Sequence, residues 1–134
     1  MHINRLVLTI AVIFVLSSVF GNFIHAILLH YDYASVPDLF RRPVDADFRL
    51  ILFSYLAFAI ASVWIYSHGV EDLPWFGQGI RFGIAMWLLT ALPTYLMAYA
   101  TQPLPEALLW KQLGYEFVSK IVLGIVTAAM VRKN

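Results

Sequence analysis

Four long apolar runs constrain this chain more than any other feature of its sequence. Residues 50–66 and 82–100 carry no charge, and residues 6–29 are interrupted only by small residues, hydroxyl groups, Asn22 and His25. As helices, these runs would be about 26, 29 and 36 Å long, close to or above the ~30 Å hydrocarbon thickness of a bilayer. We therefore expect each of the three to cross a membrane.

The fourth run is shorter and draws two charges with it. Its uncharged part, residues 121–131, would be only about 17 Å long as a helix, so a crossing helix must begin near Gln112. Glu116 and Lys120 then lie toward the membrane, four residues apart in the favourable order for an ion pair. The alternative is that Lys120 extends along its aliphatic stem to the headgroups.

Composition agrees with a membrane class. The 134 residues are 61% hydrophobic and 13% charged, whereas soluble domains are about half apolar and about a quarter charged. We predict a single all-α domain, residues 1–134, that forms an integral membrane antiparallel four-helix bundle with spans near 6–29, 50–67, 81–100 and 112–131. The first run exceeds the roughly 7–15 apolar residues of a signal peptide, so we expect an uncleaved helix.

The first and third links resemble each other. Residues 35–42 (SVPDLFRR) and 103–110 (PLPEALLW) place Pro37 and Pro105 at first-turn positions among apolar side chains. Each is expected to form a short amphipathic helix at the membrane surface. The middle link, by contrast, is expected to be a tight turn. It contains four residues that would interrupt a helix before the third span: Gly69, Pro74, Gly77 and Gly79.

Small residues four apart predict where helices pack closely, since close approach drives helix association in lipid. The candidate pairs are Ser17 with Gly21, Ala57 with Ala61, Gly79 with Gly83, and Gly124 with Ala128. We expect packing within the chain for at least three of the pairs, although such a pair can equally meet another chain.

Basic residues give the expected orientation. Arg5, Arg81, Arg132 and Lys133 fall on the side of the termini, and Arg41, Arg42, Arg49, Lys111 and Lys120 on the other. The two sums are nearly equal, but both termini carry basic residues without acidic neighbours. We therefore expect a multi-pass protein of a cell membrane with both termini in the cytoplasm.

Polar residues of the spans gather toward one membrane surface. Asn22 and His25, three apart on one helical face, lie near the end of the first span, and the alternating direction of the helices brings polar residues of the other spans to the same leaflet. We expect a cavity there, because polar groups inside membranes usually face a bundle interior or water. The candidate ligand-binding residues are Asn22, His25, His30, Arg49, Tyr55, Tyr95, Tyr99, Glu116 and Lys120.

Pro93 adds to this expectation. Within the third span it removes a backbone hydrogen bond, so a kink or a free carbonyl is predicted over residues 89–92. The alternative is that this proline merely shapes helix packing, because proline is common in membrane helices.

Several chemistries lack their sequence signals. No cysteine is present, His25 and His30 would point about 140° apart on one helix, and no HExxH pattern or nucleophile motif occurs. Bis-histidine haem, metal hydrolysis and nucleophilic catalysis are therefore not expected; a single-histidine haem or pigment ligand at His25 is an alternative that we do not favour. The net charge of +1 without a basic stripe argues against nucleic acid as a partner.

Three functions fit what is left. The first is an accessory or structural subunit whose helices dock onto other membrane subunits or a second copy of the chain. The second is a small-molecule or proton-coupled binding or transport protein, because histidine ordinarily titrates near neutrality and intramembrane carboxylates relay protons. An enzyme acting on a lipid or quinone is the third, and no residue is assigned a catalytic role.

Overall fold

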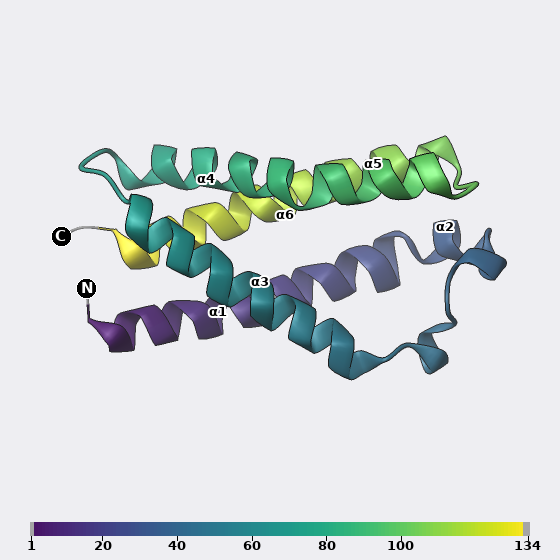
Figure 1. The fold of residues 1–134 in the computed structure, drawn as a ribbon, viewed down its shortest axis with the longest axis horizontal. Coiled ribbons are helices and arrows are strands. Elements are labelled where there is room, and N and C mark those ends of the chain that lie inside the picture. Colours follow the sequence, from purple (N-terminus) through teal and green to yellow (C-terminus); the bar gives the residue numbers. More distant parts are fainter. Residues whose placement is uncertain (1, 133–134) are drawn as a thin grey trace.

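The computed structural model describes residues 2–132, and all regular structure among them is helical (Figure 1). Four helical segments are long and apolar enough to cross a membrane, by length and composition. They are α1 (Ile3–Asn22) with the π-helix η1 (Phe23–Leu28), α3 (Phe48–Gly69), α4 (Trp75–Leu89) with α5 (Ala91–Thr101), and α6 (Glu106–Val131). Successive segments run in opposite directions, so α1 begins at the end of the bundle where α6 stops. These four segments indicate a membrane protein.

The first link differs from the helix predicted over residues 35–42. It contains α2 (His30–Ala34) and two single 3-10 turns, η2 (Pro37–Leu39) and η3 (Pro43–Asp45). The backbone of Arg42 is extended, with φ −63° and ψ 150°. Because a proline disfavours helical backbone at the residue before it, Pro37 and Pro43 divide the link into short turns.

The helices around the other two links are longer than predicted. Residues 106–110 are the first turns of α6 rather than a separate element, because the chain has no proline between Pro105 and the end of that helix. Helix α4 begins at Trp75, directly after Pro74, and so includes Gly77 and Gly79. The turn before it is held by the Gln78 side chain, which accepts from the Glu71 amide and donates to the carbonyls of Glu71 and Leu73.

Glycines allow α4 and α6 to pack with their backbones in contact. A Cβ built on Gly83 would lie 2.5 Å from the Lys120 carbonyl oxygen, and one on Gly79 would lie 2.8 Å from the Ile125 Cα. A Cβ on Gly124 would overlap the Gly79 carbonyl oxygen. The predicted close packing at Gly79, Gly83 and Gly124 is therefore confirmed, and it fixes α6 against α4.

Helix α3, the second long segment, is buried through other residues than the sequence predicts. Ser17 and Gly21 of α1 are buried as expected, but Ala57 and Ala61 of α3 are exposed. The buried residues of α3 are Ala59, Ser62, Val63 and Tyr66. Helix α3 is thus rotated from the predicted orientation, and its two outward alanines leave a small-residue strip on the surface.

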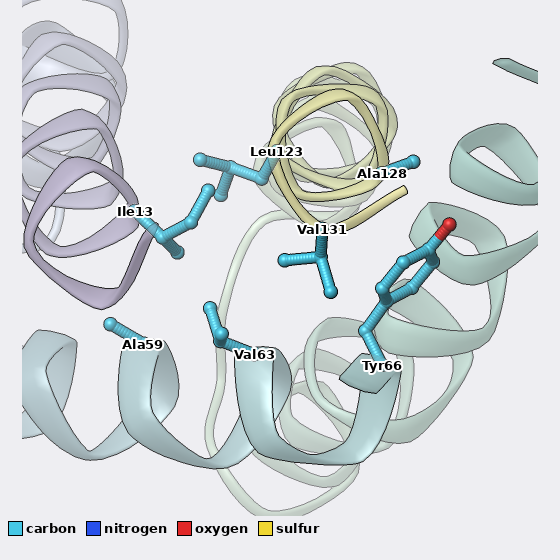
Figure 2. Close-up of a cluster of buried hydrophobic side chains, with 7 residues drawn as sticks. All are labelled: Ile13, Ala59, Val63, Tyr66, Leu123, Ala128 and Val131. Atoms are coloured by element: carbon cyan, nitrogen blue, oxygen red, sulfur yellow. The ribbon is translucent and has the colours of Figure 1, made fainter. Parts of the chain in front are cut away.

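A compact apolar core lies where α1, α3 and α6 meet, toward the end of the bundle where the chain begins (Figure 2). Ile13 of α1 faces Leu123 of α6, and Ala59 and Val63 of α3 close the cluster from below in that view. The Tyr66 hydroxyl, at the edge of this core, is the one buried side-chain nitrogen or oxygen in residues 2–132 that has no hydrogen-bond partner.

At the opposite end the bundle is looser. Helix α3 packs mainly on α1 and α6, and Figure 1 shows its first turns diverging from α5. The helix of the third segment is also interrupted there, because α4 ends at Leu89 and α5 begins at Ala91. This is the interruption predicted from Pro93, which has no N–H to bond the Leu89 carbonyl. The divergence leaves room between α3 and α5.

Candidate functional site

A cavity of about 670 Å³ occupies this space. Its walls come from α3 on one side and from the α4–α5 junction on the other, with α1, η1 and α6 contributing the remaining surface. Ala61 and Ile65 of α3 and Leu89 and Thr94 opposite them line it while being exposed. The cavity is therefore open between α3 and the third segment.

His25 reaches this cavity from the π-helix η1. The turn is closed by a bond from the Leu29 amide to the Ile24 carbonyl, an i to i−5 bond that places one more residue in the turn than an α-helix has. Ile24 and Leu29 are both buried against the bundle, whereas Asn22 is exposed. The structure therefore places His25, and not Asn22, at the cavity, although a regular helix would hold the two on one face. Single π-turns of this kind often occur at functional sites.

Hydrogen bonds to both ring nitrogens of His25 fix its orientation. The Gln112 amide donates to the Tyr33 oxygen (3.2 Å), and the Tyr33 hydroxyl lies 2.6 Å from His25 Nδ1. Burial raises the pKa of Tyr33, so this hydroxyl keeps its proton and can donate it to Nδ1. In that arrangement the imidazole is neutral, and its Nε2–H faces Glu116 Oε1 at 3.3 Å.

Glu116 is the acceptor at the centre of the network. Its Oε1 accepts from His25 and from the Tyr95 hydroxyl (3.4 Å), and its Oε2 accepts from Lys120 Nζ (2.7 Å). The Tyr95 hydroxyl also lies 3.2 Å from His25 Nε2. Three donors from three segments therefore surround one carboxylate. Such pairing is what allows a carboxylate and an ammonium to be held with only about a tenth of each side chain exposed.

Two donors of the site are not fully used. Lys120 has three N–H groups, of which one bonds Glu116, and its Nζ lies 5.1 Å from the centre of the Phe58 ring. Tyr55 lines the same cavity, and its hydroxyl forms no hydrogen bond within residues 2–132. It rests against Gly21, where a Cβ would overlap it. Tyr55 and Lys120 therefore have donors that a ligand in the cavity could use.

The structure brings five of the nine candidate residues to the cavity: His25, Tyr55, Tyr95, Glu116 and Lys120. The other four do not line it. Asn22 and His30 are exposed, with His30 against the Tyr31 ring; Arg49 is 93% exposed beside Asp47; and Tyr99 is 39% exposed on α5.

Two residues of the network were not among the candidates. Gln112 had a usable signal, because it precedes Glu116 by four residues and so shares its helix face. Tyr33 had none, since it follows His25 across the π-helix and a change of helix.

No group of three or more histidine and acidic side chains within residues 2–132 is placed to hold a metal ion. For haem or pigment at His25, a ligand would have to displace either Tyr33 or the Glu116 and Tyr95 pair from the ring.

No family model, curated protein or solved structure matches this chain.

Proposed function

We propose that the four long segments cross a membrane as an antiparallel bundle, with α2 and η2 at its surface and both ends of the chain on the cytoplasmic side. The length and apolarity of the segments support the crossings. Arg5 and Arg132, near the two ends, support the orientation. The polar network around His25 then lies in the outer half of the bilayer, near the surface that carries α2.

Within that bundle we propose a binding function: the protein holds a small amphipathic molecule that enters sideways from the bilayer. The observation that carries this proposal is the cavity of about 670 Å³ between α3 and the α4–α5 junction. Its volume falls within the roughly 300–1,000 Å³ of ordinary ligand sites, and a mostly apolar lining with a few convergent polar groups is typical of them.

The hydrogen bonding supports a ligand more than a purely structural network. If the network were purely structural, every polar group in it would be expected to have a hydrogen-bond partner within the protein. His25 and Glu116 do have such partners. Tyr55 and Lys120 keep unused donors, and both line an open cavity. Polar groups left unpaired in an apolar region are costly, so a ligand that accepts from them would stabilise the site.

Two alanines of α3 allow a matched test. Ala61 lines the cavity and Ala57 does not, and both are exposed one helical turn apart. The Ala61→Phe variant should lower binding of a single-chain amphiphile by at least about tenfold, because the new ring fills the opening, whereas Ala57→Phe should bind as the parent does. Isothermal titration of dodecanoate, dodecanol and dodecylamine into protein in phosphatidylcholine nanodiscs measures this. If none of the three probes binds the parent, or if Ala61→Phe leaves all binding unchanged, the proposal fails.

A second candidate is an accessory subunit, favoured by one observation. The strip formed by Ala57 and Ala61 faces outward, where small residues would let another helix approach closely. On this account Ala57→Phe, which should not affect ligand binding, would instead separate the protein from a partner that co-purifies in mild detergent. If the parent migrates as a lone chain and Ala57→Phe changes nothing, this candidate is wrong.

A further inference from the structure

The cavity has room for one chain rather than two. At roughly the 30 Å³ that a water molecule occupies in the liquid, 670 Å³ holds on the order of 20 non-hydrogen atoms. That suits a single acyl chain with its head group and is too little for a whole two-chain phospholipid. Residues 50–65 of α3 follow the cavity for about 22 Å, so the space is elongated along the membrane normal.

The polar and apolar parts of the lining give the bound molecule a direction. His25, Tyr55, Tyr95 and Glu116 lie toward the end of the bundle that carries α2. Ile65, Met86 and Leu123 line the opposite, deeper part. A head group would therefore sit by the hydrogen-bond network, with its chain extending toward the membrane centre.

The available donors select the head group. Tyr55 and Lys120 offer hydrogens to the cavity, while the Glu116 carboxylate already accepts from three donors. A head group that only donates, such as an ammonium, would meet the Lys120 charge and would find three of the roughly four acceptor positions of Glu116 already used. A carboxylate accepts from both and forms strong, charge-assisted hydrogen bonds.

The charge of the site requires a proton to accompany that carboxylate. Glu116 and Lys120 already balance each other, so an added anion alone would leave one uncompensated negative charge in an apolar region. The titratable groups that face Glu116 and Lys120 are His25, Tyr33, Tyr55 and Tyr95. Of these side chains, imidazole is the one that ordinarily gains a proton near neutral pH. With that proton, imidazolium pairs with Glu116 and the ligand pairs with Lys120.

The network around His25 can accept the proton at Nδ1. The ring nitrogen lies 2.6 Å from the Tyr33 oxygen, and that oxygen also contacts the Gln112 amide. If the Gln112 amide turns over, its oxygen accepts from the Tyr33 hydroxyl, and the Tyr33 oxygen then accepts from the new Nδ1–H. Both protonation states of His25 thus satisfy Tyr33 and Gln112 without moving a helix.

We propose that the cavity binds a single-chain carboxylic acid, with its carboxylate on Tyr55 and Lys120 and its proton on His25. One proton binds with each carboxylate, and an Nδ1–H bond forms on His25. The proton comes from the O–H bond of the neutral acid or, where the free ligand is ionised, from the buffer. This inference rests on the proposed binding function and narrows it to one ligand class.

Three probes with one chain length test the class. In phosphatidylcholine nanodiscs, dodecanoate should bind at least about tenfold more tightly than dodecanol, and dodecylamine most weakly. Equal binding of all three, or a preference for the amine, overturns the carboxylic acid while leaving the binding function standing. Adding phosphatidylglycerol to the discs tests whether the ligand is instead a two-chain membrane lipid. If phosphatidylglycerol competes with dodecanoate as strongly as dodecanoate competes with itself, the single-chain ligand is wrong.

Variants assign the contacts. Tyr55→Phe should weaken dodecanoate roughly fivefold and leave dodecylamine unchanged. Lys120→Met alone would remove the ammonium that balances the Glu116 charge and would destabilise the fold. The second variant is therefore Glu116→Gln with Lys120→Met, which removes both charges. It should still bind dodecanol but lose the preference for dodecanoate. Lys111→Met is the matched control, since Lys111 pairs with Asp32 outside the cavity (2.9 Å) and should keep parental selectivity.

Calorimetry in two buffers of different ionisation enthalpy tests the proton. At a pH where free dodecanoate is ionised, the parent should take up one proton for each molecule bound. The His25→Gln variant should bind without this uptake and more weakly. Proton-free binding by the parent would overturn the role of His25.

Discussion

At the scale of single residues, the donor and acceptor roles of the hydrogen-bonding groups determine how the side chains of the site are oriented. Gln112, Tyr33, His25 and Glu116 form one chain from donor to acceptor. Each group holds the next in one orientation, so the imidazole faces the carboxylate although the two belong to different helices. The donors left over at Tyr55 and Lys120 are what distinguish the site from a closed structural network.

The unpartnered hydroxyl of Tyr66 gives a stability prediction at this scale. It is buried at the edge of the core, where its ring packs edge-on against Phe82 at 5.0 Å. Tyr66→Phe removes an unsatisfied polar group and keeps the ring, so it should stabilise the protein by about 1 kcal/mol. The midpoint of thermal unfolding in detergent measures the change. A lower midpoint would mean that the hydroxyl has a partner in the folded state.

At the scale of elements, the contact between α4 and α6 is the most tightly determined feature. Their backbones touch at Gly79, Gly83 and Gly124, so the position of Lys120 on α6 is fixed relative to α4. Helix α6 in turn contacts α1, α3 and α5, and thus carries Glu116 and Lys120 to the point where those helices meet.

Two glycines of similar helical setting test this contact. Gly83→Ala would place a methyl group 2.5 Å from a backbone oxygen and should destabilise the protein by about 1–3 kcal/mol. Gly114→Ala on α6 would meet no atom within 4 Å and should stabilise it by up to about 1 kcal/mol, since alanine favours helix. Unfolding midpoints in detergent compare them. Equal effects of the two substitutions would contradict the close packing of α4 on α6.

At the scale of the whole molecule, the sequence predicts the number of long helices and the region where polar groups meet. Length and apolarity identify the four runs, and alternating direction brings His25 to the same end as Glu116 and Lys120. Pro93 likewise marks the break before α5. These features depend on composition and chain direction, which one sequence contains.

Helix rotation and the π-turn could not be predicted. In a membrane, lipid and neighbouring helices are equally apolar, so hydrophobic periodicity does not tell which face of α3 is buried. The choice of Ala57 and Ala61 over Ala59 and Ser62 followed from that ambiguity. The bond from the Leu29 amide to the Ile24 carbonyl has no sequence signature, so the contact between His25 and Tyr33, which follows that turn, could not be predicted.

A photo-crosslinking experiment tests the account most directly. Dodecanoate with a diazirine at the end of its chain is bound to the protein in nanodiscs, irradiated, and located by mass spectrometry. We predict labels at the deep end of the cavity, on Ile65, Met86 and Leu123, which an excess of plain dodecanoate removes. Labels spread over outward-facing residues such as Val15, Val19 and Phe53, and unaffected by the competitor, would contradict a ligand cavity in this fold.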